Sequence, residues 1–206
     1  MRLGIVACDI LKNEIEFVTG KDPDFVHREY LEFALHIIPE NMRAVIIEKV
    51  NALEGKVDAV LLGYATCMSL GGITDKLDVP AAMLEGSDCI EALLGTERYE
   101  EEKRSCTGTW FSSPGWAKEG VNGLIREFHL DSVEGYDPSY FLDMLFGSYE
   151  RCLFIDPGIG SEKEFHAKSE DFAKTLKLRH ERCICGLERI EEAVARAKKL
   201  GAGSSN

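Results

Sequence analysis

The sequence predicts an α/β fold, with a mostly parallel sheet flanked by helices, doubly wound in the Rossmann-like manner and contained in a single domain. Short apolar runs such as residues 2–7, 57–62 and 152–155 have the length of strands that are buried on both faces. Segments with helical spacing of apolar residues separate these runs, and this alternation is typical of βαβ units. A chain of 206 residues is also long enough to bury one core without cross-links.

The expected elements follow from local composition along the chain. Strands are expected at residues 2–7, 30–35, 57–62, 79–84, 105–112 and 152–155. Helices are expected at residues 39–53, from about residue 89, and at residues 140–146, 165–176 and 187–200. Pro39 suits a first helical turn, and residues 114–116 (Pro-Gly-Trp) are expected to form a turn. The single domain is expected over residues 1–200, followed by a flexible Gly/Ser-rich tail at 201–206.

Composition and charge exclude several classes of partner. The net charge of −12 disfavours nucleic acids and anionic membrane surfaces. No run approaches the roughly 20 apolar residues that a membrane-spanning helix needs, and the apolar N-terminal run is too short for a signal peptide. We therefore expect a cytoplasmic protein. Seven cysteines in such a compartment are expected to stay reduced, which leaves metal ligation, catalysis or burial as their roles.

Four potential metal ligands lie within five residues of the end of an expected strand: Cys8, His36, Cys67 and Cys89. If those strands are parallel neighbours, their carboxyl ends meet at one edge of the sheet. Three thiolates and an imidazole are a common set for zinc, and soft sulfur also suits copper(I) or an iron–sulfur cluster. Glu14 and Asp88 are candidates for an oxygen ligand or an outer hydrogen bond. Cys8 and Cys89 are expected to lie at helix N-termini, where the helix dipole lowers the pKa of a thiol.

The alternative is that the cysteines are buried small hydrophobes, as cysteines often are. Cys183 and Cys185 either chelate a metal with His180 or share one buried strand face, while Cys106 and Cys152 lie in apolar runs typical of a core. The loop at residues 156–160 is either an anion-binding loop or a simple turn. Nucleotide-binding glycine motifs, G-x-S-x-G and H-E-x-x-H do not occur.

An ordered set of short motifs resembles domain of unknown function 1638, over roughly residues 1–195. The motifs are Cys8 with Glu14, Leu35-His36 followed by Pro39, Gly63-Tyr64 with Cys67, Asp88-Cys89-Ile90 followed by Leu94-Gly95, and Gly115-Trp116. The chain departs from the family's usual Gly-Leu-Cys at Ala65-Thr66-Cys67, and from its usual Asn at Ile37. Both departures concern the shape of the pocket more than the ligand set.

The resemblance implies membership of a family of methanogenic archaea and bacteria that is often encoded near corrinoid-dependent methyltransferases. It implies Gly63, Tyr64 and Asp88 as candidate cofactor-binding residues and a corrinoid as a candidate cofactor. Three functions stay open. The chain is a zinc-dependent methyltransferase acting on a small thiol or methyl donor, a non-catalytic metal or corrinoid carrier that assists a corrinoid methyltransferase, or an interaction module with buried cysteines. The sequence assigns no catalytic residue.

Overall fold

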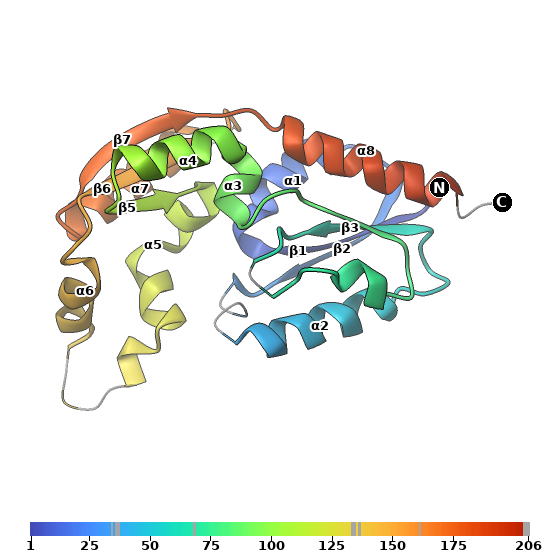
Figure 1. Ribbon diagram of the computed structural model, residues 1–206, viewed down its shortest axis with the longest axis horizontal. Coiled ribbons are helices and arrows are strands. Elements are labelled where there is room, and N and C mark those ends of the chain that lie inside the picture. The colour runs from blue at the N-terminus through green and yellow to red at the C-terminus, as the bar shows by residue number, and fades with distance from the viewer. Residues whose placement is uncertain are drawn as a thin grey trace. The chain divides into compact units, whose positions relative to one another are not determined.

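The computed structural model describes residues 1–33, 35, 38–67, 69–132, 135, 137–160 and 162–203 (Figure 1). It is an α/β structure with parallel strands flanked by helices, which confirms the predicted fold class. The described strands form two sheets, and the chain divides into two compact units, each with one sheet. Unit 1 comprises Met1–Thr96 with Gly186–Asn206, and unit 2 comprises Glu97–Cys185. The extent of a single domain over residues 1–200 stays a prediction.

Unit 1 contains a four-stranded parallel sheet in the order β2-β1-β3-β4. Its strands are β1 (Leu3–Cys8), β2 (Phe25–Leu31), β3 (Ala59–Gly63) and β4 (Ala81–Met83). Its helices are α1 (Lys12–Thr19), α2 (Pro39–Asn51), α3 (Cys89–Leu94) and α8 (Glu188–Gly203), with short 3₁₀ helices η1 (Asp9–Leu11) and η3 (Ile73–Lys76).

Helices lie on both faces of the unit 1 sheet, as in a doubly wound fold (Figure 1). On one face, Val6 packs with Met42 and Ile46 of α2 in a core cluster of buried side chains. On the other face, α8 packs on β3 and β4 and also contacts α1. The sheet is therefore buried on both faces, which explains why its central strands read as continuous apolar runs.

Unit 2 contains a three-stranded parallel sheet in the order β5-β6-β7. Its strands are β5 (Thr109–Ser112), β6 (Arg151–Asp156) and β7 (Arg179–Ile184). Its helices are α4 (Thr96–Ser105, whose first residue belongs to unit 1), α5 (Pro114–Glu127), η4 (Leu130–Ser132), α6 (Pro138–Phe146) and α7 (Glu162–Thr175). Helix α7 packs on β6 and β7, and α5 packs on α7.

Unit 2 has an aromatic core, and Arg151 is a buried cation in it. The Trp110 ring lies edge-on to Trp116 and stacks on Phe172, at centroid distances of 5.3 and 5.7 Å. The buried Arg151 guanidinium lies 3.0 Å from carboxylate oxygens of both Glu102 and Glu181. Because a buried charge needs close partners, these two carboxylates are what allows Arg151 to lie in the interior.

Several predicted boundaries are wrong. The strand expected at residues 30–35 is β2, which runs over Phe25–Leu31. It is an edge strand, and the charged residues in its middle interrupt the apolar pattern by which strands are predicted. The strand expected at 105–112 begins at Thr109, since Ser105 still belongs to α4. The turn expected at 114–116 is the start of α5, capped by Ser113.

The last helix extends further along the chain than the sequence predicts. Helix α8 continues past residue 200 to Gly203, and Gly201 packs beside Met1 and Leu3, so residues 201–203 are not a tail. Residues 204–206 lie outside the described residues. None of the described helices is long and apolar enough to span a membrane.

Candidate functional site

The candidate site lies at the carboxyl edge of the unit 1 sheet. Cys8 is the last residue of β1, paired in register with Leu31 of β2. Ala7 is paired with Gly63, the last residue of β3. The thiol of Cys8 therefore lies where the first and third strands end, which is the position that the sequence predicts for it.

The loop after β3 carries Cys67 to the same edge. It runs beside the segment after β4 through three backbone hydrogen bonds: Leu84 N to Tyr64 O at 3.1 Å, Thr66 N to Gly86 O at 3.1 Å, and Cys67 N to Ser87 O at 2.9 Å. These bonds hold Cys67 beside the segment that leads into α3, whose first residue is Cys89. The loop is thus an extension of β3–β4 pairing beyond the strands.

Cys67 has a backbone conformation that residues other than glycine rarely adopt. Its φ is 38°, in the left-handed region, at a cost of about 1–3 kcal/mol for such a residue. Arg43 of α2 helps to hold the following turn, because its Nη1 donates to the Ser69 carbonyl oxygen at 2.7 Å. Nothing in the sequence around Cys67 indicates this strain.

Burial dominates the electrostatics of the two thiols. Burial, opposed by a hydrogen bond from the Ile10 backbone and assisted by nearby Cys67, raises the pKa of Cys8 to about 12. Burial, together with the charge of Asp88, raises the pKa of Cys67 to about 11. The expectation that the helix start would lower the Cys8 pKa is therefore wrong, because desolvation outweighs the helix terminus. Both thiols are protonated at neutral pH.

Tyr64 belongs to the core cluster on the α2 face of the unit 1 sheet, which also contains Val6 and Met42. Cys8 and Cys67 both pack against this cluster. The Tyr64 side chain is 4% exposed, and its hydroxyl has no hydrogen-bond partner among the described residues. Burial raises its pKa, and the two thiols raise it further. Within the described part of the chain, the core cluster at the candidate site therefore contains a protonated hydroxyl without a hydrogen-bond partner, and two thiols pack against that cluster.

Asp88 is the N-cap of α3. Its Oδ1 accepts from the backbone N of Ile90 and Glu91, at 2.9 and 2.8 Å. Glu91 is a residue that sequence reasoning missed: its carboxylate accepts from Ser87 N at 2.7 Å and Thr96 Oγ1 at 2.6 Å. Hydrogen bonds from Ser87 and Thr96 lower the Glu91 pKa to about 2. The spacing Asp88-x-x-Glu91 is a capping-box signal that could have identified it.

Gly63 and Glu14 both have roles in packing. A Cβ at Gly63 would lie 2.4 Å from Ala7 Cβ and 2.5 Å from Ile15 Cδ1, so this position requires glycine for the approach of α1. Glu14 of α1 is completely buried, and neither carboxylate oxygen has a partner among the described residues. Burial raises the Glu14 pKa to about 8, so this carboxyl is mostly protonated at pH 7.

The predicted four-ligand set is not assembled within the described part of the chain. No three His, Cys, Asp or Glu side chains among the described residues are placed to hold a metal ion. His36 lies outside the described residues, although the preceding residue, Leu35, packs against the same core cluster as Cys8 and Cys67. All seven cysteines are described and none forms a disulfide.

The other candidates lie in unit 2 and have local partners. Cys183 is buried in β7, while Cys185 follows the strand and is partly exposed. His180 Nε2 lies 3.1 Å from the buried Ser169 Oγ, which in turn lies 3.7 Å from Cys152 Sγ. In the loop at 156–160, the Asp156 carboxylate accepts from Gly158 N at 2.9 Å, so this loop closes on its own side chain.

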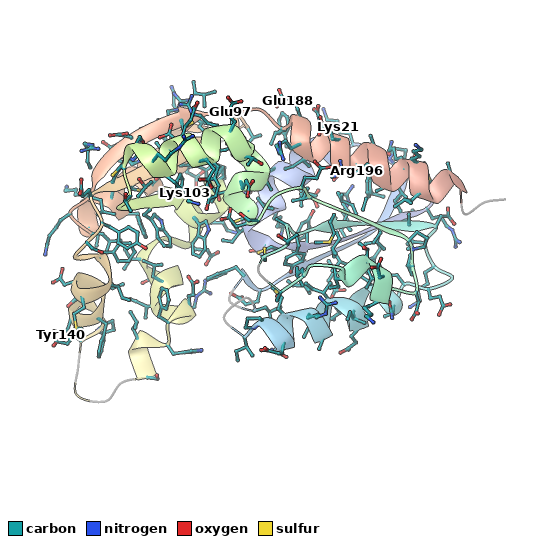
Figure 2. The ribbon with its side chains drawn as sticks, viewed as in Figure 1. Lys21, Glu97, Lys103, Tyr140, Glu188 and Arg196 are labelled. Atoms are coloured by element: carbon teal, nitrogen blue, oxygen red, sulfur yellow. The ribbon has the colours of Figure 1, made fainter. Side chains whose placement is uncertain are left out.

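A separate groove of about 730 Å³ lies between the edge strand β4 and α8. Its lining includes Pro80, Met83 and Leu200. Arg196 projects from α8 (Figure 2), and its guanidinium donates to the Met83 carbonyl oxygen at 2.8 Å and pairs with Glu85 at 3.1 Å. This cation is therefore engaged within the fold.

Comparison with known proteins gives one result. A family model described as "Protein of unknown function (DUF1638)" matches residues 30–194. The matched region includes His36, Cys67 and Cys89, and it begins after Cys8 and Glu14. Neither the curated proteins nor the solved structures give a match.

Proposed function

The chain belongs to the DUF1638 family of proteins of unknown function, and we propose that it binds a soft metal ion, zinc first of all, at the carboxyl edge of the unit 1 sheet. The observation that carries the proposal is the packing of two interacting thiols, Cys8 and Cys67, against one core cluster. The same cluster contains the Tyr64 hydroxyl, which has no hydrogen-bond partner among the described residues. Thiols in this arrangement provide the soft donors that zinc and copper(I) prefer.

The raised thiol pKa values fit a site that is completed by a cation. Without a positive charge, burial keeps Cys8 and Cys67 protonated. A bound divalent ion supplies that charge, and each coordinating thiol then releases its proton to solvent. Cys89 and His36 are the proposed further ligands. Both of these ligands are carried over from the sequence prediction.

We further propose that the site acts in methyl transfer to a small thiol, with a methyl-corrinoid as donor. When bound, the metal would keep a sulfur nucleophile deprotonated at neutral pH. The substrate sulfur forms the bond to the methyl carbon, and the electron pair of the broken cobalt–carbon bond stays on cobalt. The corrinoid and a corrinoid methyltransferase partner rest on the family resemblance. A cytoplasmic location is part of the same proposal.

Two alternatives use the same residues. In one, the site holds a structural or transported metal and the chain is a carrier or accessory protein. In the other, the thiols are core residues of an interaction module. The packing of Cys8 and Cys67 against the hydrophobic core cluster is the observation that supports this last alternative.

Metal analysis separates the metal-binding functions from the interaction module. Protein purified without chelators under reducing conditions is expected to contain about one zinc ion per chain, and to lose it in Cys8→Ser and Cys67→Ser. Cys106→Ser is the matched control, since Cys106 lies in unit 2. Zinc added to metal-free protein should release about two protons from these thiols per ion. Wild-type protein that neither contains nor takes up a soft metal contradicts the proposal.

Enzyme and carrier differ in a kinetic assay. Zinc-loaded protein is mixed with methylcobalamin and a small thiol, and the corrinoid spectrum and the methylated thiol are followed together. An enzyme raises the rate above that with free zinc, and Cys67→Ser removes the increase. A rate equal to the background, with zinc still bound, supports the carrier instead.

A further inference from the structure

Helix α6 of unit 2 carries apolar side chains on two faces. Leu142 and Phe146, one turn apart, are buried in the hydrophobic core cluster of the unit. Opposite a buried stripe of this kind, a surface helix normally has polar residues. On α6, however, Tyr140 is 54% exposed, Met144 66% and Leu145 41%. These three residues form what we call the outer face of α6, and Tyr140 projects from it (Figure 2).

The outer face is held in place by the opposite side of the helix. Asp137 caps the helix N-terminus by accepting from Ser139 N at 2.9 Å. The Phe146 ring packs edge-on to Trp110 of the core, with the centroids 5.5 Å apart. Because the helix is already ordered, a partner that binds it has little conformational entropy to remove. Exposed apolar patches commonly mark interaction sites, and methionine, as at Met144, adapts its shape to a partner.

The charge around the outer face is negative. The sequence contains no Lys or Arg between Arg126 and Arg151, but it contains six acidic residues there: Glu127, Asp131, Glu134, Asp137, Asp143 and Glu150. Asp143 is three residues after Tyr140 and therefore lies beside the outer face. Its side chain is 71% exposed, although it pairs with Lys177 at 3.1 Å. The last turn of α6 has no basic residue, so the partial negative charge of the helix C-terminus adds to that of the carboxylates.

We propose that the outer face of α6 docks a basic amphipathic helix of a partner protein. The apolar side chains of that helix cover Met144 and Leu145, and its Lys or Arg residues lie near Asp143 and the C-terminus of α6. Recognition of an amphipathic helix through apolar residues one turn apart is a common binding mode. The negative surroundings disfavour anionic lipid and a second copy of the same face, because like charges repel each other. This inference concerns unit 2 and does not depend on the metal proposed for unit 1.

The probe is a synthetic amphipathic peptide with leucines on one helical face and lysines on the other. Its binding to the full chain is measured by fluorescence anisotropy at low and at physiological ionic strength. One comparison peptide has glutamate in place of lysine, and another has serine in place of leucine. Both should bind at least about 10-fold more weakly than the probe. Binding of the probe should weaken as salt screens the charges.

Two substitutions separate docking on α6 from general attraction of a basic peptide to an acidic protein. Met144→Glu and Ile184→Glu add the same charge to unit 2. Ile184 is 74% exposed and ends β7, whereas Lys177, the partner of Asp143, precedes the start of that strand. Met144→Glu should weaken binding about 10-fold, and Ile184→Glu should bind as wild type or slightly more tightly. General attraction would instead be strengthened by both substitutions.

NMR of wild-type protein labelled at the methionine methyl groups locates the peptide without any substitution. The Met144 signal should shift on addition of the probe. Four results overturn the inference: an unshifted Met144 signal, equal affinities of wild type and Met144→Glu, stronger binding to phosphatidylcholine vesicles than to the probe, or a wild-type dimer that Met144→Glu abolishes. The last two identify a lipid surface or a second copy as the occupant instead.

Discussion

The buried carboxyl of Glu14 predicts an unusual dependence of stability on pH. Glu14 is 0% exposed, and burial raises its pKa from 4.5 to about 8. Between these two values the folded chain holds a proton that the unfolded chain has lost. Since stability rises with pH only where the unfolded state binds more protons, the contribution of Glu14 falls as pH rises through this interval.

The size of the effect follows from the two pKa values. At about 1.36 kcal/mol per pH unit, the interval from 4.5 to about 8 corresponds to about 5 kcal/mol of lost unfolding free energy. The contribution is fully present below pH 4.5 and is lost by pH 8. A loss of this size is a large part of the unfolding free energy of a typical domain, which is about 5–15 kcal/mol.

Glu14→Gln tests this reasoning, because the amide is neutral at every pH in the range. Urea unfolding of metal-free wild type and variant at pH 5, 6, 7 and 8 gives the free energy at each pH. We expect the variant to gain stability relative to wild type as pH rises, by several kcal/mol in total. Glu54→Gln replaces an exposed glutamate in the same unit and should follow the wild-type curve.

The reasoning is refuted if wild type and Glu14→Gln give parallel curves from pH 5 to 8. Parallel curves would mean that the carboxyl ionises in the folded protein as easily as in the unfolded chain. A partner or water that solvates the carboxylate would then be required.

Three further substitutions test the packing, the capping and the ion pairs of the fold. Gly63→Ala should cost about 1–3 kcal/mol in urea unfolding, since its Cβ would overlap two side chains, whereas Gly71→Ala, with nothing within 4 Å, should stay within about 0.5 kcal/mol. Asp88→Ala should cost about 1 kcal/mol by removing the α3 cap, and Asp88→Asn should restore most of it. Arg151→Ala should cost about 3–5 kcal/mol, because two carboxylates lose their buried partner; a loss below 1 kcal/mol would show that the ion pairs are solvated.

The fold class could be predicted because the central strands of both sheets are apolar on both faces. β1, β3 and β6 appear in the sequence as continuous runs for this reason. β2 could not be located correctly, because an edge strand tolerates charges and exposes Val26 by 58%. The division of the strands into two sheets could not be predicted either, because side chains alternate with the same two-residue period in every sheet.

The positions of two candidate residues could be predicted from the sequence, but their chemistry could not. The ends of apolar strands correctly locate Cys8 and Cys67 at one edge of the unit 1 sheet. The pKa of Cys8 could not be predicted, since it depends on burial, which a single sequence does not report. The lack of a hydrogen-bond partner for the Tyr64 hydroxyl, as far as the described residues go, is equally a property of packing, and a tyrosine in the sequence gives no signal of it.

The order of synthesis has a consequence for unit 1, because this unit is formed from both ends of the chain. α8, which packs on β3 and β4, is made after all of unit 2. Roughly 90 residues separate α3 from α8, which takes roughly 5–20 s at typical elongation rates. During that interval β1 and β3 are already synthesised, while the face of the sheet that α8 covers is open. The nascent chain therefore exposes the face of β3 and β4 that α8 later covers until unit 2 has been made.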